Sequence, residues 1–257
     1  NNLGICTDAL MEAVAETSEE FMERYFNGDE FSENEIRQAL RVNVADASMV
    51  PVSMGSSILA QGMYTLLDDI IKYFPSPDKR SCTGINAKSN EVYSADYDFS
   101  KPKSAYIFKT IVDPFVGKYS LIKVNSGVLK TDDLLFNHHR DTEGRIGKLY
   151  VMCGSKPQEV PELHAGDIGA LAKLSGAMTT DSLSTRANPI LFIRTSISEP
   201  YTGMRYKAKN KGDEDKISQA LQKIMQEDLT IKTVNDSANH QTLIYGIGEQ
   251  QLEVLVE

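Results

Sequence analysis

Residues 112–137 read VDPFVGKYSLIKVNSGVLKTDDLLFN, a succession of short, mostly apolar segments separated by polar turns. The segments Tyr119–Val124, Gly127–Leu129 and Leu134–Phe136 have the length of strands. Gly, Asn and Asp stand between them, and these are residues that turns favour. The stretch therefore predicts consecutive antiparallel strands joined by tight turns.

The same pattern continues on both sides of this stretch, at Ile107–Val112, Arg145–Met152 and Ile168–Leu174. Many short strands separated by Gly, Asn and Asp turns are typical of a closed antiparallel barrel. We therefore expect residues 103–198 to form a β-barrel domain.

Residues 1–77 predict a mainly helical domain. One amphipathic helix is indicated by apolar residues at helical spacing: Leu10, Val14, Phe21 and Tyr25. Ser32 followed by Glu35 forms a capping box, which supplies partners for exposed N-terminal amides and begins a second helix.

The second half of this helical region predicts a strand and a helix. Val50–Val52 is expected to be the strand. Apolar residues then recur at three- and four-residue intervals from Met63 to Phe74. Pro75 cannot continue a helix and restricts the residue before it, so the helix is expected to end near Phe74.

The remaining segments flank the barrel. Residues 78–102 lack a sustained period and predict a connecting segment. Residues 199–257 predict a strand, a helix, two strands and the start of a helix: Tyr201–Ala208, Glu214–Gln226, Leu229–Val234, Gln241–Tyr245 and the residues after Gly246. This order is that of a split βαβ layout, here truncated, and it is typical of an α+β domain.

Composition limits the classes of protein to which the chain can belong. With 257 residues and 41% apolar composition, the chain can bury cores in about two domains. No apolar run reaches the length of a membrane span, so no membrane partner is expected. The three cysteines, Cys6, Cys82 and Cys153, are far apart and predict a reduced cytoplasmic environment. The opening Asn1-Asn2, without Met, indicates a piece of a longer protein.

The formal net charge of −9 conceals an uneven distribution along the chain. Residues 1–77 hold 13 acidic and 4 basic side chains, whereas residues 103–198 hold 12 basic and 9 acidic ones. Because nucleic-acid backbones attract Lys and Arg, the barrel is the expected RNA-facing part of the chain. A surface imbalance without a partner would also account for so small an excess.

Several runs of residues resemble the translational GTPase elongation factor G. The most specific runs lie in the barrel: Asp113–Lys118, Ser126–Leu129, Arg145–Leu149 and Ala165–Ile168. Others lie on both sides: Pro51–Ser57, Tyr73–Pro77, Lys209–Lys216 and Gly246–Glu249. The resemblance covers nearly the whole chain and implies three pieces. These are the end of an α/β GTPase domain (mainly helical), the translation-factor β-barrel called domain II, and a truncated, ferredoxin-like domain III.

The resemblance also implies a site. In translational GTPases a Gly-Ser-Ala loop recognises the guanine carbonyl through backbone amides, and Gly55, Ser56 and Ser57 match this loop, with Ser57 in place of Ala. On its own such a loop is a generic turn. GTP and Mg²⁺ are thus the cofactors implied for the parent protein, and none is expected for this chain.

Phosphate-binding motifs are missing. Hydrolysis of GTP needs a Gly-rich loop with Lys, and no GxxxxGK[ST] pattern occurs in the sequence. Asn210-Lys211-Gly212-Asp213 fits a guanine-reading pattern but follows the Gly-Ser-Ser loop instead of preceding it. The parent is therefore expected to be a GTPase, whereas this chain is expected to be inactive, with no catalytic residue.

The histidines predict neither a metal site nor a catalytic group. His138 and His139 are adjacent, which is a poor arrangement for binding one metal ion, and they are expected to be a solvated turn pair. His164 stands near Asp167 but has no evident Ser or Cys partner.

The resemblance implies the ribosome, both rRNA and ribosomal proteins, as the partner of a monomeric cytoplasmic protein that promotes translocation of tRNA and mRNA. DNA is not expected as a partner. Within the barrel, the candidate rRNA phosphate contacts are Lys118, Lys130, Arg145 and Lys148. Gln250-Gln251 departs from the Leu-His that usually follows Gly-x-Gly-Glu in the family. A non-translocating paralogue or a ribosomal protection GTPase of the tetracycline-resistance type therefore stays open as an alternative.

Overall fold

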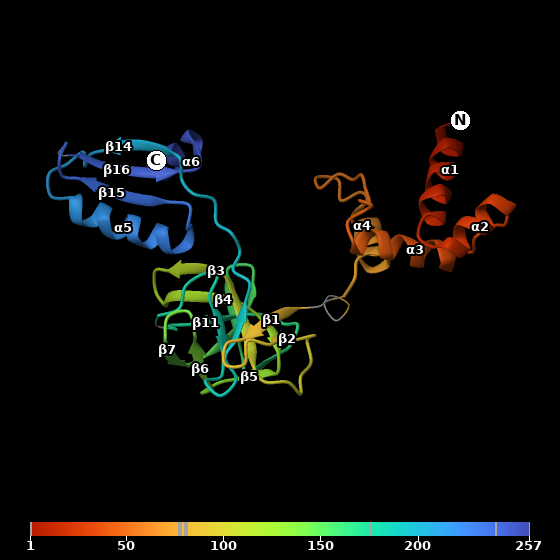
Figure 1. Cartoon of the computed structure of the whole chain (residues 1–257). Coiled ribbons are helices and arrows are strands. Elements are labelled where there is room, and N and C mark those ends of the chain that lie inside the picture. Colours follow the sequence, from red (N-terminus) through yellow and green to blue (C-terminus); the bar gives the residue numbers. More distant parts are fainter. Residues whose placement is uncertain (1, 77–78, 80–81, 175, 240, 257) are drawn as a thin grey trace. The chain divides into compact units, whose positions relative to one another are not determined.

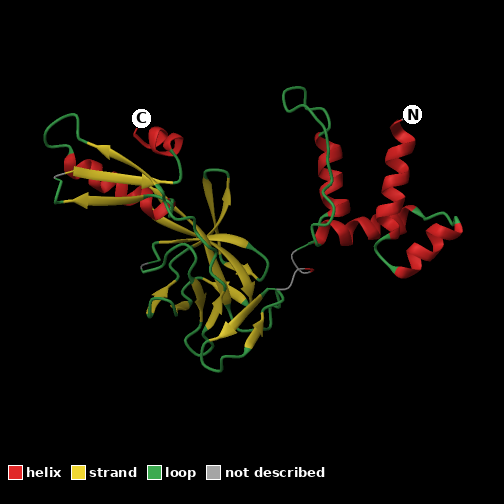
Figure 2. Cartoon of the chain, turned by 45° about the horizontal axis from the view of Figure 1, so that its top comes forward, coloured by secondary structure: helices red, strands yellow, loops and turns green. Residues whose placement is uncertain are grey.

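The computed structural model describes residues 2–76, 79, 82–174, 176–239 and 241–256, without the side chains of residues 2–6. The predicted boundary at residues 77 and 78 and the side chain of Cys6 lie outside the described residues. The chain divides into two compact units, residues 1–80 and 81–257. Helices dominate the first unit and strands the second (Figures 1 and 2).

The described residues of the first unit form the α-helices α1 (Asn2–Ala15), α2 (Glu19–Asn27), α3 (Glu33–Ala45) and α4 (Met63–Tyr73). Its core is small and centres on Val14, Ala39 and Leu40, against which Leu10 and Phe21 pack. The predicted end of the last helix near Phe74 is confirmed, because Phe74 is the C-cap of α4 and has extended backbone.

Two sequence predictions for this unit are wrong. The single helix predicted through Leu10 and Tyr25 is broken into α1 and α2. Ser18 has extended backbone and its Oγ accepts a hydrogen bond from the amide of Phe21, so it caps α2. The predicted strand Val50–Val52 is unpaired loop, and Val50 and Val52 are 75% and 86% exposed. β-branched residues favour extended backbone, but a strand also needs a neighbouring strand.

The predicted capping box at the start of α3 is confirmed. The amide of Glu35 donates to Ser32 Oγ, and the amide of Ser32 donates to Glu35 Oε2 at 2.8 Å. Arg24 Nη1 also donates to Glu35 Oε1 at 2.6 Å. These hydrogen bonds, first that from Arg24 and then those from Ser32, lower the pKa of Glu35 from 4.5 to about 2.

The second unit contains the barrel. An eight-stranded antiparallel sheet has the order β7-β6-β12-β3-β4-β11-β8-β9, and β5 pairs with β10 in a separate ribbon. The bounds are β3 (Ser104–Asp113), β4 (Gly117–Ser126), β5 (Val128–Lys130), β6 (Leu134–Asn137), β7 (Thr142–Arg145), β8 (Leu149–Cys153), β9 (Lys156–Val160), β10 (Glu162–His164), β11 (Ile168–Ala172) and β12 (Ser182–Ser184). One apolar cluster, including the fully buried Ile107, Ile122 and Leu149, fills its interior. The barrel-type fold is thus confirmed.

The opening stretch forms the centre of this sheet. β3 and β4 are paired as a hairpin whose last pair is Asp113 with Gly117. Asp113 Oδ1 accepts hydrogen bonds from the amides of Phe115 and Val116, both at 2.8 Å. The carboxylate thereby closes the turn, which Gly117 leaves with a φ of 94° that glycine adopts without strain.

Residues 78–102 are more than the connecting segment that the sequence predicts. They contain β1 (Thr83–Asn86) and β2 (Val92–Ser94), and β1 lies between β2 and β13 (Ile190–Phe192) in a three-stranded antiparallel sheet. Ala95, Ile190 and Phe192 form a small core of their own. The strands are too short to produce a period in the sequence, and their partner β13 comes much later in the chain, after the whole barrel.

Residues 199–257 have the predicted order of elements. β14 (Thr202–Tyr206), β15 (Lys232–Asp236) and β16 (Gln241–Gly246) form a sheet of order β14-β16-β15. α5 (Glu214–Glu227) and α6 (Glu249–Val256) supply Leu221 and Leu252 to a core with Ile231 and Ile244. The α+β prediction is therefore confirmed. Within the described part of the chain, no helix is both long and apolar enough to cross a membrane.

Candidate functional site

The Gly-Ser-Ser loop lies between α3 and α4. Ser56 and Gln61 form a backbone bridge with N–O distances of 3.0 and 3.1 Å. A Cβ on Gly55 would lie 2.7 Å from the carbonyl oxygen of Gln61, so the turn has room only for glycine. Ser53 Oγ donates to Asp69 Oδ2 at 2.8 Å and ties the loop to α4.

This geometry separates the two serine amides. The amide of Ser56 is used within the loop, because it donates to Gln61. The amide of Ser57 is in an exposed residue and has no hydrogen-bond partner among the described residues. A free backbone donor is what the predicted contact with a guanine carbonyl requires, so that role for Ser57 stays a prediction.

Three of the four predicted rRNA contacts are paired with carboxylates of the barrel itself. The pairs are Lys130 with Glu162 (Nζ–Oε2 3.2 Å), Arg145 with Asp132 (Nη1–Oδ1 3.6 Å) and Lys148 with Glu159 (Nζ–Oε2 2.7 Å). Each pair has no net charge, which weakens its attraction for a phosphate. The structure does not bring the four residues together as one patch of free cations.

The fourth predicted contact, Lys118, is half-buried at the start of β4. Its Nζ donates to the carbonyl oxygen of Ala177. Burial lowers the pKa of Lys118, and the positive charge of Arg140 lowers it further, while Asp181 raises it. Lys118 therefore belongs to a group of charges that includes Arg140 and Asp181.

Asp181, which precedes β12, is the centre of this group. Its side chain is fully buried, and it accepts hydrogen bonds from two arginines: from Arg140 Nε to Oδ2 at 2.7 Å and from Arg194 Nη2 to Oδ1 at 2.5 Å. Asn137 Nδ2 and the amide of Met178 also donate to Oδ2, at 2.7 and 3.0 Å. Both oxygens of the carboxylate thus accept hydrogen bonds from fixed donors.

The pKa of Asp181 reflects two opposing effects. Burial acts to raise it, because a carboxylate loses its hydration in the interior. The hydrogen bonds from Asn137, Arg140 and Met178 act in the other direction, and together they lower the pKa below its usual 3.8. Asp181 is therefore ionised at neutral pH.

His139 also belongs to this group; its predicted place in a turn is confirmed, but the prediction that it is solvated is wrong. The ring is half-buried, and Nε2 is shielded from solvent with no hydrogen-bond partner among the described residues. Burial lowers the pKa of His139, as does the charge of Arg194. His138 is exposed and its ring lies against Phe136, with centroids 5.7 Å apart. We call Asp181, Arg140, Arg194, Lys118 and His139 the Asp181 cluster.

Sequence reasoning missed the arginines of the Asp181 cluster. Arg140 and Asp181 are 41 positions apart and Arg194 follows Asp181 by 13, and no local motif connects them. The His138-His139-Arg140 run is a weak signal, because it places a cation beside two titratable rings. The pairing of β6 with β12 brings the segments of Arg140 and Asp181 together. Arg194 lies two residues beyond Phe192, the last residue of β13, and the amide of Phe192 donates to Ser182 Oγ of β12.

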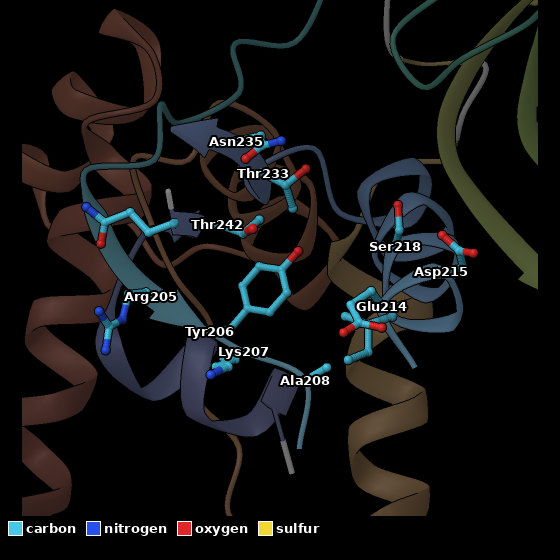
Figure 3. A pocket seen from close by; sticks show the side chains of 12 residues that line it. Arg205, Tyr206, Lys207, Ala208, Glu214, Asp215, Ser218, Thr233, Asn235 and Thr242 are labelled. Carbon is cyan, nitrogen blue, oxygen red and sulfur yellow. The ribbon is translucent and has the colours of Figure 1, made fainter. Parts of the chain in front are cut away.

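A pocket of about 640 Å³ lies between the sheet β14-β16-β15 and the start of α5. Figure 3 shows the ring of Tyr206 between Thr233 and Thr242 of the strands and Glu214 and Ser218 of the helix. Its lining carries charges of both signs, from Arg205, Lys207, Glu214 and Asp215.

Asn210-Lys211-Gly212-Asp213 lies beside this pocket and has a local role. The carboxylate of Asp213 accepts from Lys216 Nζ at 2.9 Å and from Asn210 Nδ2 at 3.2 Å, and these contacts lower its pKa. A guanine-reading Asp needs a free carboxylate to accept from the base. The motif is thus engaged in a turn at the N-terminus of α5.

His164 is likewise engaged within the barrel. Its Nε2 lies 3.0 Å from Glu162 Oε1, and Asp167 Oδ2 accepts from the backbone amide of His164 and not from its ring. The sequence neighbours His164 and Asp167 therefore do not form a dyad.

Comparison with known proteins agrees with this architecture. Residues 102–185 match the family described as elongation factor G domain 2, and residues 197–257 match elongation factor G, domain III. A crystal structure from Thermus thermophilus is similar over 95% of the chain, with 27% sequence identity and a TM-score of 0.73. The chain spans 34% of the length of that protein's chain. Because the two matched domains follow each other and together cover more than half of the 257 residues, the chain belongs to the elongation factor G family.

Proposed function

We propose that the chain is part of a ribosome-binding GTPase that promotes translocation of tRNA and mRNA during protein synthesis. The observation that supports this most is the succession of elongation factor G domain 2 and domain III on one chain. The partner in this proposal is the ribosome, and the protein acts as a cytoplasmic monomer.

In this proposal GTP and Mg²⁺ bind the parent protein, and the chain contributes only the guanine side of the site. Gly55 and Ser56 shape the loop, and the free amide of Ser57 donates to the guanine carbonyl. Gly-rich phosphate-binding sequence is missing, and phosphates carry most of the charge of the nucleotide. The chain therefore neither binds GTP appreciably nor hydrolyses it.

Isothermal titration calorimetry of the 257-residue chain with GTP and Mg²⁺ tests this division of roles. No heat of binding is expected at micromolar concentrations. Magnesium-dependent binding at those concentrations would show that phosphate contacts exist in the chain, and would contradict the assignment.

The ribosome contact is proposed for the barrel, whose 12 basic side chains exceed its 9 acidic ones. Co-sedimentation of the chain with small ribosomal subunits over a salt titration tests it. Because phosphate contacts release counterions, the affinity should fall steeply as salt rises. Failure to sediment with the subunits at low salt would reject the proposal.

A second candidate within the family is a GTPase that binds the ribosome without moving tRNA, as a paralogue or a tetracycline-resistance type of protection protein. Gln250-Gln251 favours it, since it departs from the family pattern. Gln251 is structural, because its Nε2 donates to Asp228 Oδ2 and Thr230 Oγ1, both at 2.9 Å, and its Oε1 accepts from the amide of Ile247. A translocation assay with the parent protein separates the two candidates.

A further inference from the structure

We propose that Arg140 and Arg194, held in place by Asp181, bind a phosphate group of the ribosomal RNA backbone. In this inference they are the principal phosphate contact of the barrel, in place of Lys130, Arg145 and Lys148. The inference rests on the proposed function, because it specifies which part of the barrel contacts the RNA.

The charge distribution supports this choice. Lys130, Arg145 and Lys148 each stand beside one carboxylate, so each pair is locally neutral. In the Asp181 cluster, Arg140 and Arg194 share the single carboxylate of Asp181, and the same carboxylate acts electrostatically on the nearby Lys118. A local positive excess stays there, and an anion is attracted to it.

The hydrogen-bonding capacity of the arginines supports it as well. Each guanidinium has five N–H donors, and each arginine donates to Asp181 through one nitrogen. No other protein acceptor for the guanidinium group of Arg140 or Arg194 occurs within the described residues. The side chains of Arg140 and Arg194 are 37% and 46% exposed, so their remaining donors can reach a ligand. A planar guanidinium matches a phosphate with two parallel hydrogen bonds.

Asp181 makes the arrangement rigid before any ligand arrives. It is fully buried and fixed by Asn137 and the amide of Met178, and it holds one arginine on each carboxylate oxygen. A flexible surface lysine loses side-chain entropy when it binds, whereas these arginines have already lost much of it. The buried Nε2 of His139 lies in the same cluster, and the pKa of His139 responds to the charges of Arg194 and Asp181.

The test compares variants of the 257-residue chain in co-sedimentation with small ribosomal subunits. Arg140→Ala with Arg194→Ala should lower the affinity roughly tenfold or more, because charge-assisted hydrogen bonds are lost. The slope of log affinity against log salt should shrink by about one. The matched control, Arg145→Ala with Lys148→Ala, removes the same formal charge and should change both quantities less.

Conservative variants separate charge from geometry. Arg140→Lys with Arg194→Lys keeps both charges, so the salt slope should persist while the affinity falls with the loss of the planar donors. Circular dichroism melting of every variant checks that the barrel is folded. The inference would be overturned if the folded Arg140→Ala, Arg194→Ala variant bound subunits as tightly as the unsubstituted chain and with the same salt slope.

NMR titration of the His139 ring provides a readout that does not need the ribosome. Inorganic phosphate or a short oligoribonucleotide bound at the cluster should shift its resonances and raise its pKa, because an anion stabilises the imidazolium. A response to phosphate alone indicates a single-phosphate site, and a response to RNA alone indicates that the backbone is needed; both support the inference. No response to either ligand would overturn it, even where the parent chain sediments with subunits and the proposed function holds.

Discussion

The barrel and the helical unit of residues 1–76 use similar kinds of apolar sequence in different ways. In the barrel, Ile107, Ile122 and Leu171 are almost completely buried in one continuous cluster. In the helical unit, α4 is described over its full length and has no buried residue. Tyr64 and Ile71 on this helix are 85% and 71% exposed.

The difference arises from the type of element. An antiparallel sheet that curls back supplies both sides of its own core, since inward residues of β3, β4, β6, β8, β11 and β12 join in one apolar cluster. A helix has an apolar stripe that needs a separate surface to cover it. Apolar spacing is therefore enough to predict a helix at Met63–Tyr73, but it does not show whether the stripe is covered.

The largest loss of stability in this comparison is expected when a substitution creates a cavity in the barrel. Ile122→Ala should lower the free energy of unfolding by about 2–5 kcal/mol, because Ile122 is fully buried. The matched variant Ile71→Ala in α4 should change it by less than about 0.5 kcal/mol. Urea denaturation, with segment-resolved hydrogen exchange to assign each loss, measures both. Equal losses would mean that α4 is packed against a surface in solution.

A smaller effect is expected when Asp181 is changed. Asp181→Asn should cost about 1–3 kcal/mol at neutral pH, because it weakens the hydrogen bonds from two arginines. The lowered pKa also predicts acid sensitivity. The stabilisation by the ionised group is complete above the unfolded value of 3.8 and is lost as the pH falls through the lower folded value.

Denaturant unfolding of the barrel between neutral pH and the strongly acidic range measures this contribution. Below pH 3.8 the unsubstituted chain should lose stability more steeply than the Asp181→Asn variant, which has no carboxylate at this position. Parallel curves for the two proteins would show that another carboxylate dominates acid unfolding of the barrel.

The smallest effect is expected in the helical unit. Ser32→Ala removes the cap of α3 and should cost about 1 kcal/mol in that unit alone. The pKa of Glu35, about 2 in the unsubstituted chain, should rise, because Ser32 donates hydrogen bonds to the Glu35 carboxylate. Thermal unfolding and an NMR titration of the Glu35 carboxyl check the two results. An unchanged pKa would leave Arg24 as the sole partner of consequence.

Local sequence signals predicted much of the fold correctly. The capping box at Ser32, the end of α4 before Pro75 and the order of elements after residue 199 each depend on residues close together in the chain. The strands on either side of Gly117 were predicted for the same reason, since the turn residues and the period lie within the β3–β4 hairpin. The break between α1 and α2 was missed because the helical spacing of apolar residues continues across Ser18, the residue at which the second helix begins.

The pairing of distant segments could not be read from local patterns. β1 and β2 depend on β13, and the unpaired Val50–Val52 has strand-forming residues without a neighbouring strand. The same holds for the candidate site. A count of charges indicated a basic barrel, but the neutral pairs at Lys130, Arg145 and Lys148 depend on which carboxylates fold against them.

The amino-acid sequence was sufficient to predict most of the elements, the barrel and α+β domains and the family resemblance, because period, caps and turn residues act over a few positions. Tertiary structure alone decided which cations stand in neutral pairs and which share one carboxylate. Asp181, Arg140 and Arg194 come from three separate segments, and their contact exists only after the strands have paired. Electrostatic interaction depends on the distance between charges and on their burial, and neither quantity can be predicted from local sequence.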